Sequence, residues 1–285
     1  MIKVVKFGGS SLASATQFAK VGNIIRADEN RRYVVPSAPG KRNAKDTKVT
    51  DMLYSCYGQA ILGEDAEKDF EEQLEAIKER YNSIISGLDL ELSLDEEFKT
   101  IRTNFSKKIG RDYAASRGEY LNGIIMAAYL GYEFIDAAEV IVFDENGNFD
   151  GDKTHEILSA RLENTERAVI PGFYGALPDG TIKTFSRGGS DITAVGIAAH
   201  FGWDCEFYTT AECMYTADPQ MYPEARPIKA ITYEEMMEMT NLGADKVETR
   251  AVELAKKYNV KLFLGKSLEK DKSKGTYIVN KEMIV

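Results

Sequence analysis

Two glycine-serine segments hold the residues of this chain that are best suited to chemistry. The first spans residues 6–11, KFGGSS, and the second spans residues 185–194, FSRGGSDITA. Each sets small residues and hydroxyls beside a cation, which lets backbone N–H groups approach a phosphate or a carboxylate closely. Either segment alone is typical of an ordinary turn, but the two together indicate a pair of anion-binding sites.

The surrounding residues predict how each segment is held. An apolar run at 2–7 is typical of a buried strand and an amphipathic stretch at 12–25 of a helix, so the first glycine pair lies at a strand-to-helix junction. There the exposed N–H groups and the positive end of the helix favour an anion, and Lys6 adds a full positive charge. A turn at 178–180, PDG, predicts a hairpin before the second segment, which opens a helical run at 192–199.

The wider pattern predicts an α/β fold. Short apolar runs alternate with helix-length stretches, and we interpret the runs as strands at residues 2–7, 33–35, 133–135, 168–170, 205–208 and 261–264. This alternation favours a three-layer αβα sandwich with a mainly parallel open sheet and two closely packed lobes. Ligands of such sheets bind at the carboxyl ends of the strands, where both glycine-serine segments fall, so we expect one shared cleft.

Composition and charge exclude several classes of protein. The 285 residues are 44% apolar and contain neither a signal-peptide stretch nor a run near the roughly 20 residues of a membrane helix, so we expect a cytoplasmic protein without a membrane partner. The net charge is −9 and no long basic run occurs, which argues against nucleic acid as a partner.

Residues 64–100 hold 13 acids and 4 bases, which accounts for the whole net charge. Apolar residues recur there by threes and fours, so we expect one solvated helix that packs by one face. These apolar residues stand at positions 66, 70, 74, 77, 81, 84 and 88.

Other motifs of the sequence do not indicate a binding or catalytic site. Residues 265–267, GKS, copy the end of a P-loop without its first glycine, and we expect a plain loop there. Residues 144–152 resemble a calcium loop, but Phe149 stands where that loop needs glycine. The three cysteines lack the spacing of a zinc site, and neither His155 nor His200 has the surroundings of a catalytic triad. We expect no metal site formed by the protein alone.

The scarcity of histidine bears on mechanism. Phosphoryl transfer to an alcohol usually needs a base, whereas a carboxylate, with a pKa of about 4, is already ionised at neutral pH. Cations and backbone N–H groups aimed at the moving phosphoryl group would suffice for such an acceptor, and Lys6, Gly8 and Gly9 can supply them.

Residues 116–121, SRGEYL, together with the two glycine-serine segments, are similar to the motifs of aspartate kinase, within the amino acid kinase superfamily. The order and the separation of the motifs also agree. Further matches at residues 36–40, 49–51, 170–175, 215–219 and 241–244 extend the resemblance over essentially the whole chain.

The resemblance implies phosphorylation of the side-chain carboxylate of L-aspartate to 4-phospho-L-aspartate with ATP and Mg²⁺, a step toward lysine, threonine and methionine. It assigns Lys6 and Asp191 to catalysis. It assigns aspartate binding to Ser37, Thr50, Glu119, Phe173, Arg187 and Ser190. It assigns nucleotide binding to Lys6, Gly8, Gly9, Ser10, Thr209, Thr210, Tyr215 and Gln220. Arg187 would hold the α-carboxylate bidentately and Glu119 would accept from the α-ammonium.

The resemblance also implies one amino acid kinase domain over residues 1–285, with the acceptor lobe at about 1–170 and the nucleotide lobe at about 171–285. Family members normally continue into two small regulatory domains, which we do not expect within these residues. Superfamily members often dimerise, so a homodimer is among the expected partners, beside L-aspartate and ATP.

Departures from the family's pattern concentrate in the nucleotide half. Residues 209–215 are TTAECMY where the family usually has TDVDGVY, Gln220 replaces a common arginine, and Asp245 replaces a lysine. Two alternatives therefore stay open. One is a catalytically impaired, kinase-like protein that binds an amino acid or serves regulation, and the other is a kinase for a different small carboxylate acceptor.

Overall fold

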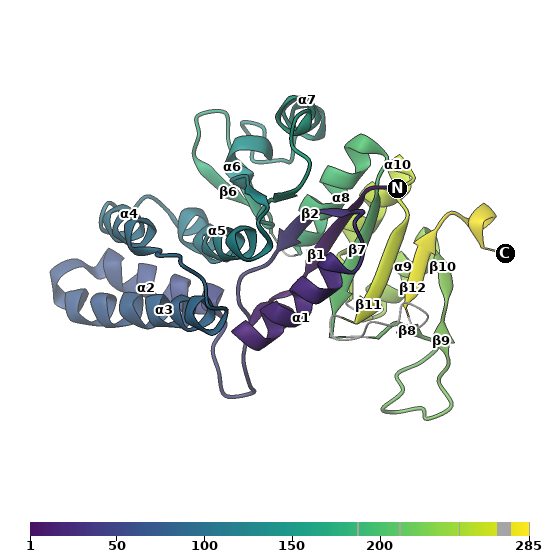
Figure 1. The fold of residues 1–285 in the computed structure, drawn as a ribbon, viewed down its shortest axis with the longest axis horizontal. Helices are drawn as coiled ribbons and strands as arrows, with labels where there is room; N and C mark the ends of the chain where they lie inside the picture. Colours follow the sequence, from purple (N-terminus) through teal and green to yellow (C-terminus); the bar gives the residue numbers. More distant parts are fainter. Residues whose placement is uncertain (187, 211, 245, 267–274, 285) are drawn as a thin grey trace.

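One open sheet runs through the computed structural model of the chain (Figure 1). The structure describes residues 1–186, 188–210, 212–244, 246–266 and 275–284. The main sheet has the strand order β10-β12-β11-β7-β1-β2-β4-β3, and its neighbours are parallel except β11 with β12. Its strands are β1 (Lys3–Phe7), β2 (Arg31–Pro36), β3 (Glu133–Phe134), β4 (Ala168–Val169), β7 (Asp204–Thr209), β10 (Ala230–Thr232), β11 (Leu262–Lys266) and β12 (Thr276–Val279).

Helices cover both faces of this sheet. Neighbouring residues of a strand face opposite sides, so Val5 packs with α1 to α5 while Val4 packs with α6 to α10. These layers confirm the predicted αβα sandwich. The helices are α1 (Ala15–Arg26), α2 (Val49–Leu62), α3 (Glu67–Gly87), α4 (Asp95–Ser106), α5 (Arg111–Leu130), α6 (Ala137–Val140), α7 (Gly151–Leu162), α8 (Gly189–Phe201), α9 (Tyr233–Asn241) and α10 (Thr249–Tyr258).

The elements around the two glycine-serine segments follow the predicted order. A short 3-10 turn, η1 (Gly9–Leu12), stands between β1 and α1, and α1 begins only at Ala15 because the side chain of Ser14 caps it by accepting from the N–H of Gln17. The hairpin is β5 (Tyr174–Ala176) with β6 (Ile182–Thr184), paired antiparallel as predicted. Helix α8 starts at Gly189, three residues earlier than the predicted helical run.

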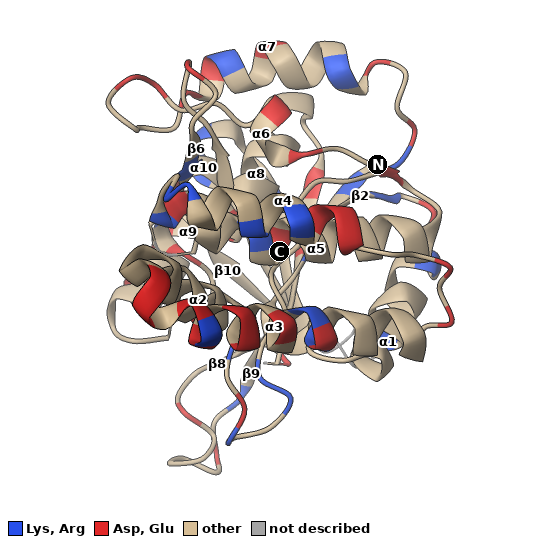
Figure 2. Ribbon diagram, turned by 90° about the vertical axis from the view of Figure 1, so that its left-hand side faces the viewer, with Lys and Arg blue, Asp and Glu red and all other residues tan. Residues whose placement is uncertain are grey.

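The acidic region differs from its prediction. Instead of one helix, α3 and α4 cover it, separated by a turn in which Asp89 has a φ of 53°. Phe70, Leu74 and Ile77 are buried as the spacing predicts. Together with α2, these helices form an arm beside the sheet, at the left of Figure 1, and Figure 2 shows charged residues along the outer surfaces of α3 and α4.

Several other boundaries are also corrected. Gly265 and Lys266, predicted to lie in a loop, belong to β11, because they pair with Tyr208 and Thr209 of β7; Ser267 lies outside the described residues. The sequence reading missed β10 and β12, as well as a small sheet of β8 (Met214–Tyr215) with β9 (Pro227–Ile228). The division into two lobes stays a prediction, because one sheet continues through both. Among the described residues, no helix is both long enough and apolar enough to span a bilayer.

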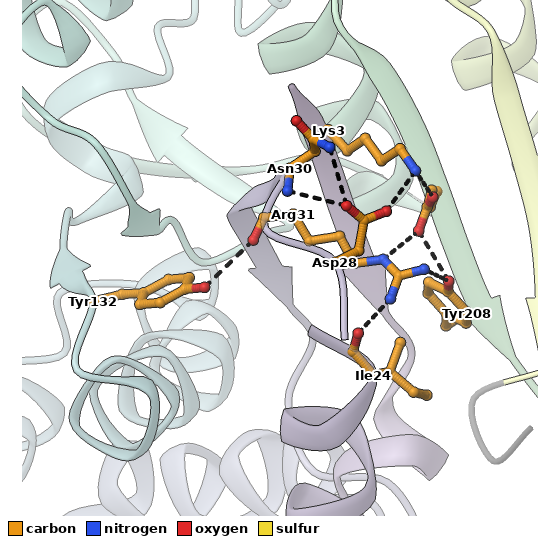
Figure 3. Close-up of polar contacts among 8 residues, drawn as sticks. Lys3, Ile24, Asp28, Asn30, Arg31, Tyr132 and Tyr208 are labelled. Atoms are coloured by element: carbon orange, nitrogen blue, oxygen red, sulfur yellow. Dashed lines mark hydrogen bonds and ion pairs between the residues drawn. The ribbon is translucent and has the colours of Figure 1, made fainter. Parts of the chain in front are cut away.

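A buried polar network joins the three central strands on the side of α1 (Figure 3). Nε of Arg31 in β2 lies 2.7 Å from Oε2 of Glu206 in β7, and Lys3 in β1 lies 2.9 Å from Oε1 of the same carboxylate. The hydroxyl of Tyr208 accepts from Nη2 of Arg31 at 2.7 Å and donates to Glu206 at 2.9 Å. Each buried charge thus has a partner, which holds β2, β1 and β7 in register.

Candidate active site

The two predicted catalytic side chains meet where β1 ends and α8 begins. Lys6 is in the central strand, flanked by β2 and β7. Its Nζ lies 2.7 Å from Oδ1 of Asp191, and both side chains are largely buried. Oδ2 of Asp191 accepts the backbone N–H of Glu248, the residue that precedes α10, at 3.1 Å. The ammonium is therefore fixed at the carboxyl edge of the sheet.

The first glycine turn lies beside this ion pair, and its two glycines have opposite surroundings. A Cβ on Gly9 would stand 2.6 Å from the carbonyl oxygen of Ala38, so the turn packs directly against the loop after β2. A Cβ on Gly8 would meet only the carbonyl oxygen of Tyr208, at 4.0 Å, among the described residues. The turn thus has one closed side and one open side, and the open side can take a phosphate at the N–H groups.

On the acceptor side, three polar residues from different elements converge. The hydroxyls of Ser37, after β2, and Ser190, in the first turn of α8, lie 3.2 Å apart. Nδ2 of Asn122, on α5, donates to the carbonyl oxygen of Ser37 at 2.6 Å. Among the described residues, Oδ1 of the buried Asn122 has no hydrogen-bond partner, which leaves an acceptor for a ligand.

Glu119 is a buried carboxylate with a strongly raised pKa. It lies one turn before Asn122 on the same face of α5 and is 6% exposed. Burial raises the pKa of Glu119 to about 7, against the opposing effects of a backbone hydrogen bond at Ala38 and the charge of Lys6. Within the described part of the chain, its Oε2 is buried without a hydrogen-bond partner. A ligand cation would satisfy this oxygen and favour the ionised form.

Thr50 and Phe173 border the same region. Oγ1 of Thr50, at the start of α2, lies 3.8 Å from the position of a Cβ on Gly118, the residue before Glu119. Phe173 has a φ of 81°, which is strained for a bulky side chain. Its N–H bonds to Oγ1 of Thr193 at 3.3 Å, which holds this strained residue beside α8.

Arg187 lies outside the described residues, as do Ala211 and Asp245. Its neighbour Gly188 has a φ of 66°, a left-handed conformation that lets the chain turn sharply into α8. A Cβ there would also stand 2.6 Å from the Cβ of Glu248. The turn before Ser190 and Asp191 therefore requires glycine.

Within the described part of the chain, the residues predicted to bind nucleotide form fewer hydrogen bonds with one another than the residues of the acceptor side do. Thr209 ends β7 and Thr210 follows it at the surface. The hydroxyl of Tyr215 is 3.1 Å from Oε2 of Glu212. Gln220 is exposed in the loop between β8 and β9, which projects from the sheet in Figure 1, and its N–H bonds to Asp218 at 2.8 Å. Gly8, Gly9 and Ser10, by contrast, directly follow the strand that carries Lys6.

Sequence reasoning missed some residues that form the site. Asn122 was identifiable, because it follows Glu119 by three residues and so shares its helix face. Gly40 was not, because its N–H donates to the carbonyl oxygen of Gly9 at 2.8 Å only once the two loops meet. Gly172 is similar, since a Cβ there would stand 2.6 Å from Oγ of Ser190.

The described residues contain no cluster of three or more metal-ligating side chains. The loop that resembles a calcium site uses Oδ1 of Asp144 to accept the N–H groups of Asn146 and Asn148. At the ion pair, the site offers the carboxylate of Asp191. This arrangement fits a Mg²⁺ ion that arrives on the phosphates of a nucleotide, because Mg²⁺ commonly takes one or two carboxylates beside phosphate oxygens.

The sequence profile of the amino acid kinase family matches residues 1–266, and the chain belongs to this family. Aspartokinase 3 of Bacillus subtilis (strain 168) is 34% identical over 295 aligned positions, which cover 98% of this chain and 64% of that protein. The crystal structure of Clostridium acetobutylicum aspartate kinase superposes with a TM-score of 0.91 at 40% identity and covers 100% of this chain and 63% of that one.

The structure of E. coli aspartokinase III in complex with aspartate and ADP superposes with a TM-score of 0.83 at 25% identity. It covers 99% of this chain and 65% of the E. coli chain. The chain therefore spans slightly less than two thirds of the length of these relatives.

Proposed function

We propose that this chain transfers the terminal phosphoryl group of ATP to the side-chain carboxylate of L-aspartate, giving 4-phospho-L-aspartate. The observation that carries the proposal is the buried carboxylate of Glu119, whose Oε2 has no hydrogen-bond partner among the described residues and which feels the charge of Lys6, the partner of Asp191. An amino acid needs both groups, a buried anion for its ammonium and a cation for the reacting end. The relatives named aspartokinase, one of them solved with aspartate and ADP, support the same substrates.

Each residue has a defined task in this proposal. Glu119 accepts from the α-ammonium, while Ser37 and Ser190 orient the substrate by hydrogen bonds. Arg187 holds the α-carboxylate. The acceptor carboxylate is already ionised at neutral pH, so the reaction needs no general base.

The phosphoryl group is handled by fixed charges and dipoles. Lys6 neutralises the charge that develops during transfer, and Asp191 keeps its ammonium in place. The Gly8–Gly9–Ser10 turn holds phosphate oxygens by the backbone N–H groups of Gly9 and Ser10, since the N–H of Gly8 donates to the carbonyl oxygen of Tyr208 at 3.3 Å. Mg²⁺, when bound with the nucleotide, would neutralise phosphate charge, with Asp191 as the carboxylate within reach. Thr209, Thr210, Tyr215 and Gln220 as nucleotide contacts, a homodimer and a cytoplasmic location remain predictions.

A coupled assay of ADP release tests the proposal. With ATP and Mg²⁺ present, we expect turnover that depends on L-aspartate, with little or none on L-glutamate or L-asparagine. The variant Lys99→Ala removes an exposed cation that pairs with Glu96 on α4 and should keep full activity. Folded protein that releases ADP no faster with aspartate than without it would contradict the proposal, and turnover on another carboxylate would redirect it.

A further inference from the structure

Helix α3 carries one buried arginine that the proposed function leaves without a task. The outer face of α3 is charged and solvated, but the side chain of Arg80 is 2% exposed. A guanidinium is costly to bury and is almost never fully buried unless it is paired. Its partners therefore indicate what it does.

Arg80 contacts the two chain segments that meet at the glycine turn. Its Nη2 donates to the carbonyl oxygens of Ala13, at 3.1 Å, and of Gly40, at 2.7 Å. Ala13 directly follows η1, and Gly40 in turn donates its N–H to the carbonyl oxygen of Gly9 at 2.8 Å. A single nitrogen atom thus bridges the turn after β1 and the loop after β2.

The other end of the guanidinium is fixed by Asp46. Nη1 of Arg80 lies 2.5 Å from Oδ2 of Asp46, a residue of the same loop. Asp46 also accepts from Nε of Arg42 at 2.8 Å, and these contacts, led by that of Arg42, hold the pKa of Asp46 well below its ordinary value. The carboxylate is therefore ionised throughout the physiological range and the Arg80 contact persists.

The next residue of α3 supports the acceptor side. The hydroxyl of Tyr81, which is fully buried, donates to the carbonyl oxygen of Gly118 at 2.7 Å. Gly118 immediately precedes Glu119 on α5. Two consecutive residues of α3 therefore contact the supports of the phosphate turn and of the acceptor carboxylate.

We propose that Arg80 is a positioning residue that holds the Gly8–Gly9–Ser10 turn against the loop at residues 37–46, so that the N–H groups of the turn are oriented for phosphate before ATP binds. The inference rests on the proposed function only in taking the ligand of the turn to be ATP. Loss of the guanidinium would leave two buried carbonyl oxygens without their donor and would remove one of the two cations that pair with Asp46. The turn would then become mobile while the rest of the site stays in place.

The test compares Arg80→Met with Arg102→Met, which removes an exposed arginine paired with Glu71 on the same arm. Hydrogen exchange should accelerate in Arg80→Met within residues 7–14 and 38–48, and not elsewhere. The KM for ATP should rise and kcat should fall, together by about 10- to 100-fold, because small displacements of positioning groups have effects of this size. The KM for aspartate should stay within about twofold. Arg102→Met should change none of these quantities.

The milder variants Arg80→Lys and Asp46→Asn keep the test decisive if Arg80→Met does not fold, and both should show the same pattern more weakly. Unchanged exchange in residues 7–14 and 38–48 would overturn the proposal. So would acceleration spread over the whole chain with equal rises in both KM values, since that describes general destabilisation. If the unaltered protein shows no aspartate-dependent turnover, the proposed function fails, and the exchange measurement still decides whether Arg80 holds the turn.

Discussion

The acceptor side and the nucleotide side of this site differ in how far the protein organises them in advance. On the acceptor side, Ser37, Ser190 and Asn122 are joined by hydrogen bonds, and Glu119 is buried one turn before Asn122 on α5. On the nucleotide side, Thr210 and Gln220 are at the surface. Two departures from the family's pattern, Thr210 and Gln220, fall on that exposed side, whereas Cys213 and Met214 of the altered segment 209–215 are buried.

The difference between the two sides predicts which substrate the protein selects more strictly. A preformed set of polar groups rejects a substrate that leaves any of them unpaired, so the acceptor side should discriminate strongly among amino acids. In the proposed function, a surface with exposed contacts can change residues and still bind a nucleotide, because the phosphates at the glycine turn supply most of the affinity. Variants on each side test this difference.

The largest effect is expected for Lys6→Ala, which acts on the boundary between the two sides. Removing a cation that stabilises the transferring group should lower kcat by about 10²- to 10³-fold. The KM for aspartate should change little, because Glu119, Ser37 and Ser190 remain. Steady-state kinetics with each substrate varied in turn measure both values. A large rise in the KM for aspartate without loss of kcat would show that Lys6 serves binding instead.

The next largest effect is expected for Gly8→Ala, which changes only the proposed phosphate-binding turn. Gly8 has φ −72° and ψ 161°, which alanine adopts freely, so Gly8→Ala should fold normally. The added methyl group would enter the open space of the turn, and overpacking of about 1–3 kcal/mol corresponds to about 5- to 150-fold in the KM for ATP. Gly58→Ala in α2, where a Cβ meets nothing within 4 Å, is the matched control. Unaltered ATP kinetics in Gly8→Ala would exclude phosphate binding at this position.

The pH dependence of the KM for aspartate tests the role of Glu119 on the acceptor side. Because burial raises its pKa to about 7, the ionised carboxylate that receives the ammonium is lost as the pH falls below that value. The KM for aspartate should rise about tenfold per pH unit below about pH 7. Glu119→Gln should raise this KM by about 10- to 100-fold and remove its pH dependence over this range. An equally steep profile in Glu119→Gln would assign the titration to another group.

The raised pKa of Glu119 also predicts how the stability of the substrate-free protein depends on pH. Its pKa in the folded protein exceeds the ordinary value of 4.5, so its contribution favours the folded state at low pH and is lost as the pH rises toward about 7. At pH 8, Glu119→Gln should be more stable than the unaltered protein by on the order of 3 kcal/mol, and at pH 4 the gain should vanish. Urea unfolding at the two pH values measures this difference. A gain independent of pH would contradict the assignment.

The smallest effect on catalysis is expected for a change in the buried polar network of β1, β2 and β7. Tyr208→Phe removes the hydroxyl that bonds to Arg31 and Glu206, and should lower the free energy of unfolding by about 1–3 kcal/mol. The backbone carbonyl of residue 208 still accepts from the N–H of Gly8, so both KM values should stay within about twofold. Tyr277→Phe, on the partly exposed β12, should leave stability unchanged. A marked rise in the KM for aspartate would show that the network reaches the acceptor side.

The sequence predicts the sheet, the hairpin and both glycine turns because each is a local pattern of apolar runs and turn residues. It also places Lys6 and Asp191 at a common edge, through the rule for parallel strands. It does not predict the roles of Gly40 and Arg80, because their contacts form between segments that are far apart in the chain. The acidic region was misread as one helix because the apolar spacing of α3 continues to Leu88 and gives no signal of the turn at Asp89.

A crystal structure with both ADP and L-aspartate bound would show whether Glu119 and Lys6 bind opposite ends of the acceptor. The proposed function predicts that the α-ammonium of aspartate lies within hydrogen-bond distance of Oε2 of Glu119. It further predicts that the side-chain carboxylate points toward Nζ of Lys6 and that the diphosphate lies at the Gly8–Gly9–Ser10 turn. Aspartate bound away from Glu119, or ADP bound on the other edge of the sheet, would contradict it.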